Sequence, residues 1–259
     1  MSDAVLLPVD APRRFHFSWV PAVLFRPRQT FSKIAAQSSG VWLTPLLILT
    51  VTAVLQVLVA GSIKQSAALS GQVELPPEFQ YYSPEQQAQF QQALAATSGP
   101  VFIYVFPALM ATAKVWVGWL LVGGLIHLVL TLLGGRGDTD SAMNLVAWSS
   151  LPLAVRELVR CVAMFSSKHL IANPGLAGFA PAGTGDLSLY LSAFLSLIDL
   201  YIIWHIVLMI IGVRAGNGLT LAKATGGILV SILLVLLLQA LLMYFMTRLG
   251  GLNIIRPFF

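Results

Sequence analysis

Residues 42–63, WLTPLLILTVTAVLQVLVAGSI, form an apolar stretch without a charged side chain. At a helical rise of about 1.5 Å per residue, such a stretch crosses the roughly 30 Å hydrocarbon core of a bilayer. The whole chain shares this character, since 57% of its 259 residues are hydrophobic, 10% are charged and the mean hydropathy is +0.83. Soluble domains carry about 25% charged residues. The composition therefore indicates a membrane protein and excludes a large soluble catalytic domain.

Four further apolar stretches follow the first one, and together the five predict an all-α integral membrane bundle of five transmembrane helices. The third is the least hydrophobic because it contains Pro152 and several charged side chains. In the fifth, Gly227 and Ser231 have the small-xxx-small spacing that favours close helix contact. The predicted membrane domain is 41–247, with spans at 42–63, 101–133, 141–165, 187–213 and 224–246, followed by a tail at 248–259.

The connections between the predicted spans are mostly short. In the loop 64–100, Ser83 and Gln86 have the spacing of a capping box around Pro84, which predicts a short helix. The turn GGRGDTD at 134–140 is too short to hold a domain and returns the chain directly to the membrane.

The basic residues are unevenly divided between the two sides of five spans. Cytoplasmic loops of membrane proteins carry an excess of Lys and Arg. One side would hold eight, namely Arg13, Arg14, Arg26, Arg28, Lys33, Arg136, Arg214 and Lys223, and the other four, namely Lys64, Lys168, Arg248 and Arg256. We therefore predict a cytoplasmic N-terminus and an extracytoplasmic C-terminus. Loss of the third span would break this alternation.

The segment 1–40 is predicted to be cytoplasmic and to carry an amphipathic helix at the membrane interface. Its aromatic and apolar side chains alternate with basic ones, a composition that anionic lipids attract. The interfacial anchors predicted from this pattern are Trp19, Arg26, Arg28, Phe31 and Lys33. The segment is either a topology anchor only or also a docking site for a partner.

Five charged side chains fall within or beside the predicted spans, where an ionisable group is costly unless it is paired or hydrated. They are Lys114, Arg156, Glu157, Arg160 and Asp199. Counted from the outer ends of their spans, Arg156 and Asp199 lie at similar depths of roughly 14 Å and 18 Å, so their side chains can meet. Two interpretations are open: a structural ion-pair lock between the third and fourth spans, which we favour, and a binding site for an anionic lipid headgroup or small anion.

His127 and His205 also lie in predicted spans. They stand alone on different helices, without the spacing of a metal site. We interpret them as hydrogen-bonded or cavity-facing residues, and a proton relay is the less favoured alternative.

No motif of a known enzyme class is found, and the only cysteine, Cys161, cannot form a disulfide framework or a thiolate metal site within the chain. We therefore predict no catalytic activity, no cofactor, no bound metal and no nucleic-acid partner.

Three blocks of sequence resemble the Yip family of membrane proteins. They are LFRPRQTFSKIAAQSSGVWLTPLLILTV (24–51), LLGGRGDTDSAMNLVAWSSLPLAV (132–155) and IIWHIVLMIIGVRAGNGLTLAKA (202–224), which occur in the family's order. The resemblance implies five spans and a cytoplasmic N-terminus. The short loops are similar to those of a prokaryotic branch, which implies location in the plasma (inner) membrane. Eukaryotic relatives are associated with Rab-type GTPases, a role that the resemblance does not carry over to this chain.

Taken together, the sequence and the resemblance favour a non-catalytic accessory or scaffold protein. Its expected partners are membrane lipids and other integral membrane proteins, with an export or transporter complex as one candidate, or a second copy of itself. The alternative is a small transporter or channel for an ion, lipid or small anion, in which the intramembrane charges line a hydrated path.

Overall fold

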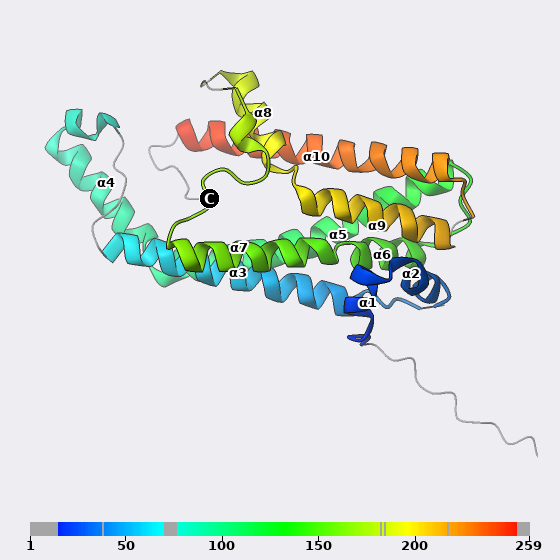
Figure 1. Cartoon of the computed structure of the whole chain (residues 1–259). Coiled ribbons are helices and arrows are strands. Elements are labelled where there is room, and N and C mark those ends of the chain that lie inside the picture. The colour runs from blue at the N-terminus through cyan, green and yellow to red at the C-terminus, as the bar shows by residue number, and fades with distance from the viewer. Residues whose placement is uncertain are drawn as a thin grey trace, which may run out of the picture.

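The structure is a computed structural model that describes residues 15–37, 39–69, 77–181, 183, 185–216 and 218–252. In these ranges every regular element is helical, which confirms the predicted all-α class. Figure 1 shows long helices that run side by side, with α1 and α2 at one end. The elements are α1 (Trp19–Phe25), α2 (Pro27–Ala35), α3 (Leu43–Leu69), η1 (Pro77–Tyr81), α4 (Pro84–Thr97), η2 (Val101–Val105), α5 (Phe106–Leu132), α6 (Thr139–Ser149), α7 (Leu151–Ser167), η3 (Ala177–Phe179), α8 (Asp186–Ser196), α9 (Leu200–Gly216) and α10 (Leu221–Leu252).

Three helical segments of the described chain are long and apolar enough to cross a membrane. They are Leu43–Ala67, Val101–Leu132 and Leu221–Leu249, and they match the first, second and fifth predicted spans. The fourth predicted span is not a single helix. It consists of α8 and α9, which meet at a bend of 60°. If that bent pair is one span, the described residues contain four candidates.

The third predicted span, 141–165, consists of two helices, α6 and α7, that are separated at Ser150. Pro152 is the second residue of α7, where its missing N–H group costs no helical hydrogen bond. Asp138 caps the start of α6 by accepting a hydrogen bond from the Ser141 N–H at 2.8 Å. Neither helix is a candidate span by itself, and the five-span count is therefore not established by the length and composition of the helices.

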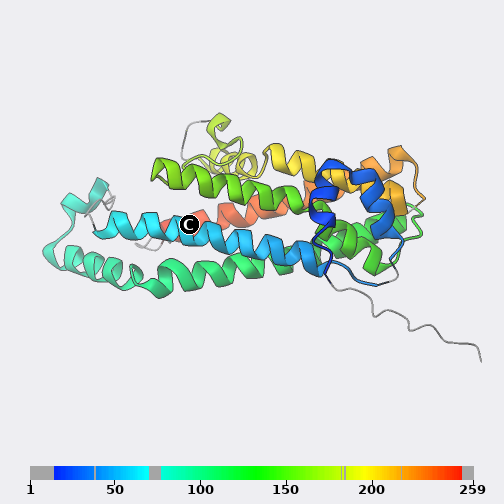
Figure 2. The same ribbon diagram turned by 60° about the horizontal axis from the view of Figure 1, so that its bottom comes forward.

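The N-terminal helices lie across one end of the bundle (Figure 2). Helix α2 packs against α9, and its Phe31 is only 2% exposed, so Phe31 lies in the protein core. Gly212 of α9 makes room for it, because a Cβ there would lie 2.8 Å from Phe31 Cδ1 and would also overlap Leu145. The apolar face of α2 is thus covered by other helices of the protein. That Phe31 and its neighbours anchor the protein at the membrane interface stays a prediction.

Two buried side chains of α6 form hydrogen bonds with the backbone of the segment that precedes α3. Asn144 accepts a hydrogen bond from the Val41 N–H at 2.8 Å and donates one to the Ser39 carbonyl oxygen at 3.2 Å. Trp148, which is 0% exposed, donates from its indole nitrogen to the Val41 carbonyl oxygen at 3.1 Å. These bonds satisfy backbone groups that burial would otherwise leave unpaired.

Candidate functional site

The break between α8 and α9 is organised by Asp199. One of its carboxylate oxygens, Oδ1, accepts hydrogen bonds from the N–H groups of Tyr201 at 3.0 Å and Ile202 at 2.9 Å. These are among the first N–H groups of α9, which have no partner within the helix, so Asp199 is its N-cap. The carboxylate charge also interacts favourably with the positive end of the helix dipole. The polar break is therefore stabilised at a point where the sequence is otherwise apolar.

The other carboxylate oxygen of Asp199 faces two arginines of α7. Its Oδ2 lies 3.5 Å from Arg156 Nη1 and 3.8 Å from Arg160 Nη2. Glu157 Oε1 contacts the same pair, at 3.0 Å from Arg156 Nε and 3.5 Å from Arg160 Nη1. The two carboxylates thus offset the repulsion between arginines that are four residues apart on one helix. These four side chains carry no net charge together.

A cavity of about 330 Å³ lies beside this ion-pair network and is lined by residues of α3, α5, α6, α7, α9 and α10. Helix α8 packs against α10 and turns away from α7, so it does not continue α9 along the bundle (Figure 1). Arg156, Glu157 and Arg160 form part of the wall.

Besides Ser150 and His205, three further polar side chains line the cavity, each from a different helix. They are Gln56 of α3, Lys114 of α5 and Gln239 of α10. Within the described part of the chain, none of the three makes a side-chain hydrogen bond or an ion pair. Lys114 gives the surroundings of the cavity an excess positive charge. Unpaired polar groups are costly in an apolar medium, so a group that can hydrogen-bond with these three side chains would be favoured at the cavity.

The two histidines have separate surroundings. His205 is 4% exposed, and its Nδ1 donates a hydrogen bond to the Ser149 carbonyl oxygen at 2.8 Å, while the residue also lines the cavity. His127 Nε2 is 3.4 Å from Thr139 Oγ1, near the turn between α5 and α6, and does not line the cavity. In the residues that the structure describes, no group of three or more His, Cys, Asp or Glu side chains is placed to hold a metal ion.

The N-terminal residues that the sequence singled out lie in the segment of α1 and α2, at one end of the bundle (Figure 1). Trp19 stacks on His16 with ring centroids 4.0 Å apart, and it packs against the buried Trp148. Arg28 and Lys33 are exposed on α2, and the Arg26 carbonyl oxygen accepts a hydrogen bond from Thr30 Oγ1 at 3.0 Å. The predicted site residues therefore form two groups, one around the cavity and one around α1 and α2.

Gln56 and Gln239 were not among the residues predicted from the sequence. The signal was present, because an uncharged amide within an apolar span needs a partner just as a charge does. Reasoning from ionisable side chains alone does not find these two amides.

The family profile of the Yip1 domain matches residues 22–243 of the chain. This match covers most of the chain and extends from α1 into α10. The chain belongs to the Yip1 domain family. The family and the long apolar helices together identify the protein as an integral, multi-pass membrane protein. Neither a curated protein nor a solved structure shows a significant match.

The matched region of this Yip1 domain contains both groups of polar residues described above. The charged network of α7 and Asp199, all three unpaired polar residues of the cavity, and Arg28 of α2 lie between residues 22 and 243. Arg248, near the end of α10, lies outside it. Both groups are thus parts of the Yip1 domain itself.

Proposed function

We propose that this Yip1-domain protein is a non-catalytic accessory or scaffold protein that associates with other integral membrane proteins. The observation that supports the proposal is the cavity with Gln56, Lys114 and Gln239, whose polar groups lack partners in the described chain. In a bilayer, apolar surface does not by itself favour a protein partner over lipid, whereas interhelical hydrogen bonds do. A polar side chain from a partner helix would satisfy these groups. An export or transporter complex is the partner class that we propose.

The charged network next to the cavity has a structural role in this proposal. Arg156, Glu157, Arg160 and Asp199 neutralise one another and fasten the break of α8–α9 to α7. Intramembrane charges usually pair in this way. Lys114 then remains as the charged group that can contact a partner.

The test is co-purification of the full chain in mild detergent, followed by quantitative mass spectrometry. The cavity variant is Gln56→Leu combined with Gln239→Leu, and the control is Val51→Leu combined with Leu238→Met, at exposed positions of the same two helices. We expect a stoichiometric membrane-protein partner with the unaltered chain and the control, and its loss with the cavity variant. Purely homomeric material from all three would contradict the proposal.

A small transporter or channel is the second candidate, and the interruption of α8–α9 favours it. Broken helices beside a polar cavity are a recurring feature of transporter binding sites, where the start of a half-helix faces the substrate. Here, however, the start of α9 is occupied by the Asp199 carboxylate. Protein reconstituted in liposomes should move a small anion or lipid if this candidate is correct, and Lys114→Gln should abolish that movement.

We also propose the five-span arrangement, with α6 and α7 as the third span and α8 and α9 as the fourth. The plasma (inner) membrane is the proposed location, with α1 and α2 on the cytoplasmic side. The distribution of charge supports this orientation, since the turns that carry Arg136, Arg214 and Lys223 lie at the same end as α1 and α2 (Figure 1). Positive charge typically stays on the cytoplasmic side.

A further inference from the structure

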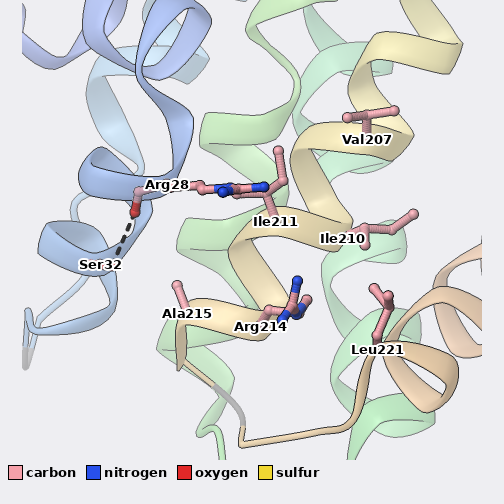
Figure 3. Close-up of a pocket in the computed structure, with 8 residues that line it drawn as sticks. All are labelled: Arg28, Ser32, Val207, Ile210, Ile211, Arg214, Ala215 and Leu221. Carbon is pink, nitrogen blue, oxygen red and sulfur yellow. Dashed lines mark hydrogen bonds between the residues drawn. The ribbon is translucent and has the colours of Figure 1, made fainter.

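A second cavity, of about 570 Å³, lies between α2, α9 and the start of α10, and shares no lining residue with the first one. Figure 3 shows Arg28 extending from α2 toward α9, and Arg214 on the last turn of α9 beside the same space. Ser32 also lines it, with its hydroxyl donating to the Arg28 carbonyl oxygen at 3.0 Å. We call this space the arginine groove.

The arginine groove has an uncompensated positive charge. None of the residues that line it is acidic, and neither Arg28 nor Arg214 forms an ion pair within the described residues. This distinguishes them from the arginines of α7, which are all paired with carboxylates. Guanidinium groups present several N–H donors in a planar fork that fits phosphate oxygens. The groove is therefore suited to a phosphate group.

The other wall of the groove is apolar. It is formed by Val207, Ile210 and Ile211 of α9 and by Leu221 at the start of α10. Arg214 and Leu221 lie where the apolar part of α9 ends and the apolar span of α10 begins. Lipid headgroups meet hydrocarbon at the ends of apolar spans, so we expect both residues near that boundary. A ligand that fills the groove thus needs a phosphate at one end and an apolar chain at the other.

We propose that the arginine groove binds one anionic phospholipid, with its phosphate between Arg28 and Arg214 and an acyl chain along Val207 and Ile210. A soluble phosphate compound would satisfy the arginines but would leave the apolar wall exposed. Phosphatidylcholine would fit the wall, but its choline brings a positive charge toward two guanidinium groups. This binding is independent of the accessory role proposed for the polar cavity.

The test uses the full chain, purified in detergent and titrated with phosphatidylglycerol or phosphatidylcholine, with bound lipid counted by native mass spectrometry. The groove variant is Arg28→Gln with Arg214→Gln. The control, Lys33→Gln with Arg136→Gln, removes the same charge from the same end of the protein but from residues that do not line the groove. A third variant, Arg28→Lys with Arg214→Lys, keeps both positive charges but removes the planar guanidinium groups that fit phosphate oxygens. The thermal unfolding temperature of each variant is measured first, to establish that it is folded.

We expect one tightly bound phosphatidylglycerol in the unaltered protein and the control, and an affinity about 30-fold lower in the groove variant, since each basic residue near anionic lipid contributes about fivefold. The lysine variant should lie between them. Equal loss in the groove variant and the control would overturn the proposal, as would equal affinity for the two lipids. If glycerol 3-phosphate at millimolar concentration displaced the lipid and bound equally well, the ligand would be a soluble phosphate compound and the lipid assignment would be wrong.

Discussion

The charge of Asp199 can be tested separately from its role as a helix cap. Asp199→Asn removes the negative charge that faces Arg156 at 3.5 Å and Arg160 at 3.8 Å. Asparagine keeps an oxygen that can accept the N–H groups of Tyr201 and Ile202, and asparagine is a good N-cap. The start of α9 should therefore stay intact while the ion pairs are lost.

The size of the effect follows from the burial of the pair. Removing one partner of a buried ion pair costs about 3–5 kcal/mol, whereas an exposed pair contributes about 0–1 kcal/mol. The side chain of Asp199 is 14% exposed and that of Arg156 is 20% exposed, which places the pair between these limits. We expect Asp199→Asn to lower the free energy of unfolding by about 2 kcal/mol. Asp199→Ala, which also loses the cap, should cost about 1 kcal/mol more.

The assay is unfolding of the purified full chain by sodium dodecyl sulfate in mixed micelles, followed by circular dichroism. Arg156→Gln and the double variant with Asp199→Asn complete a double-mutant cycle, and Asp140→Asn, an exposed acidic residue in the first turn of α6, is the control. If the pair is a structural ion-pair lock, the double variant should lose less stability than the two single variants lose together. The difference, which is the coupling free energy, should be about 1 kcal/mol or more. Additive effects, within about 0.5 kcal/mol, would refute the reasoning.

Three further predictions concern packing, a buried amide and orientation. Gly212→Ala should destabilise the protein by about 1–3 kcal/mol, because the new Cβ would overlap side chains of α2 and α6. The control, Gly226→Ala, places its Cβ in open space and should not destabilise the protein. Thermal unfolding in detergent compares the two variants. By the same measurement, Asn144→Ala should cost about 2 kcal/mol or more, since it leaves buried backbone groups unpaired, and an unchanged melting temperature would contradict this. In a Cys161→Ser background, a membrane-impermeant maleimide applied to intact cells should label Lys168→Cys but not Arg136→Cys, and the reverse pattern would invert the proposed orientation.

The helices and the meeting of Arg156 with Asp199 could be predicted from the sequence, for different reasons. Apolar stretches of membrane length have few alternatives to a helix, since every backbone group must be paired within the segment. The contact of Arg156 with Asp199 was predicted from their similar depths in the predicted spans, because oppositely charged side chains at similar depths on neighbouring helices usually pair. Neither argument required knowledge of the packing.

The break at Asp199 and the position of Phe31 could not be predicted in the same way. Residues 187–213 contain no proline, and Asp199 was interpreted only as a charge within a span. An Asp directly before an apolar helix is also an N-cap signal, and here the cap was decisive. The apolar side chains of α2 indicate a buried face, but the pattern is the same whether lipid or α9 covers it. Long-range packing decides between them.

The docking of α2 on α9 has a consequence for biosynthesis. Helix α2 is among the first elements to be made, yet its apolar face is covered by α9, which ends at Gly216. At about 5–20 residues per second, the ribosome completes α9 on the order of 10 to 40 s after α2. During this interval the membrane surface is the apolar environment nearest to Phe31. We therefore expect α2 to lie on the membrane surface in the nascent chain until α9 is made and covers its apolar face.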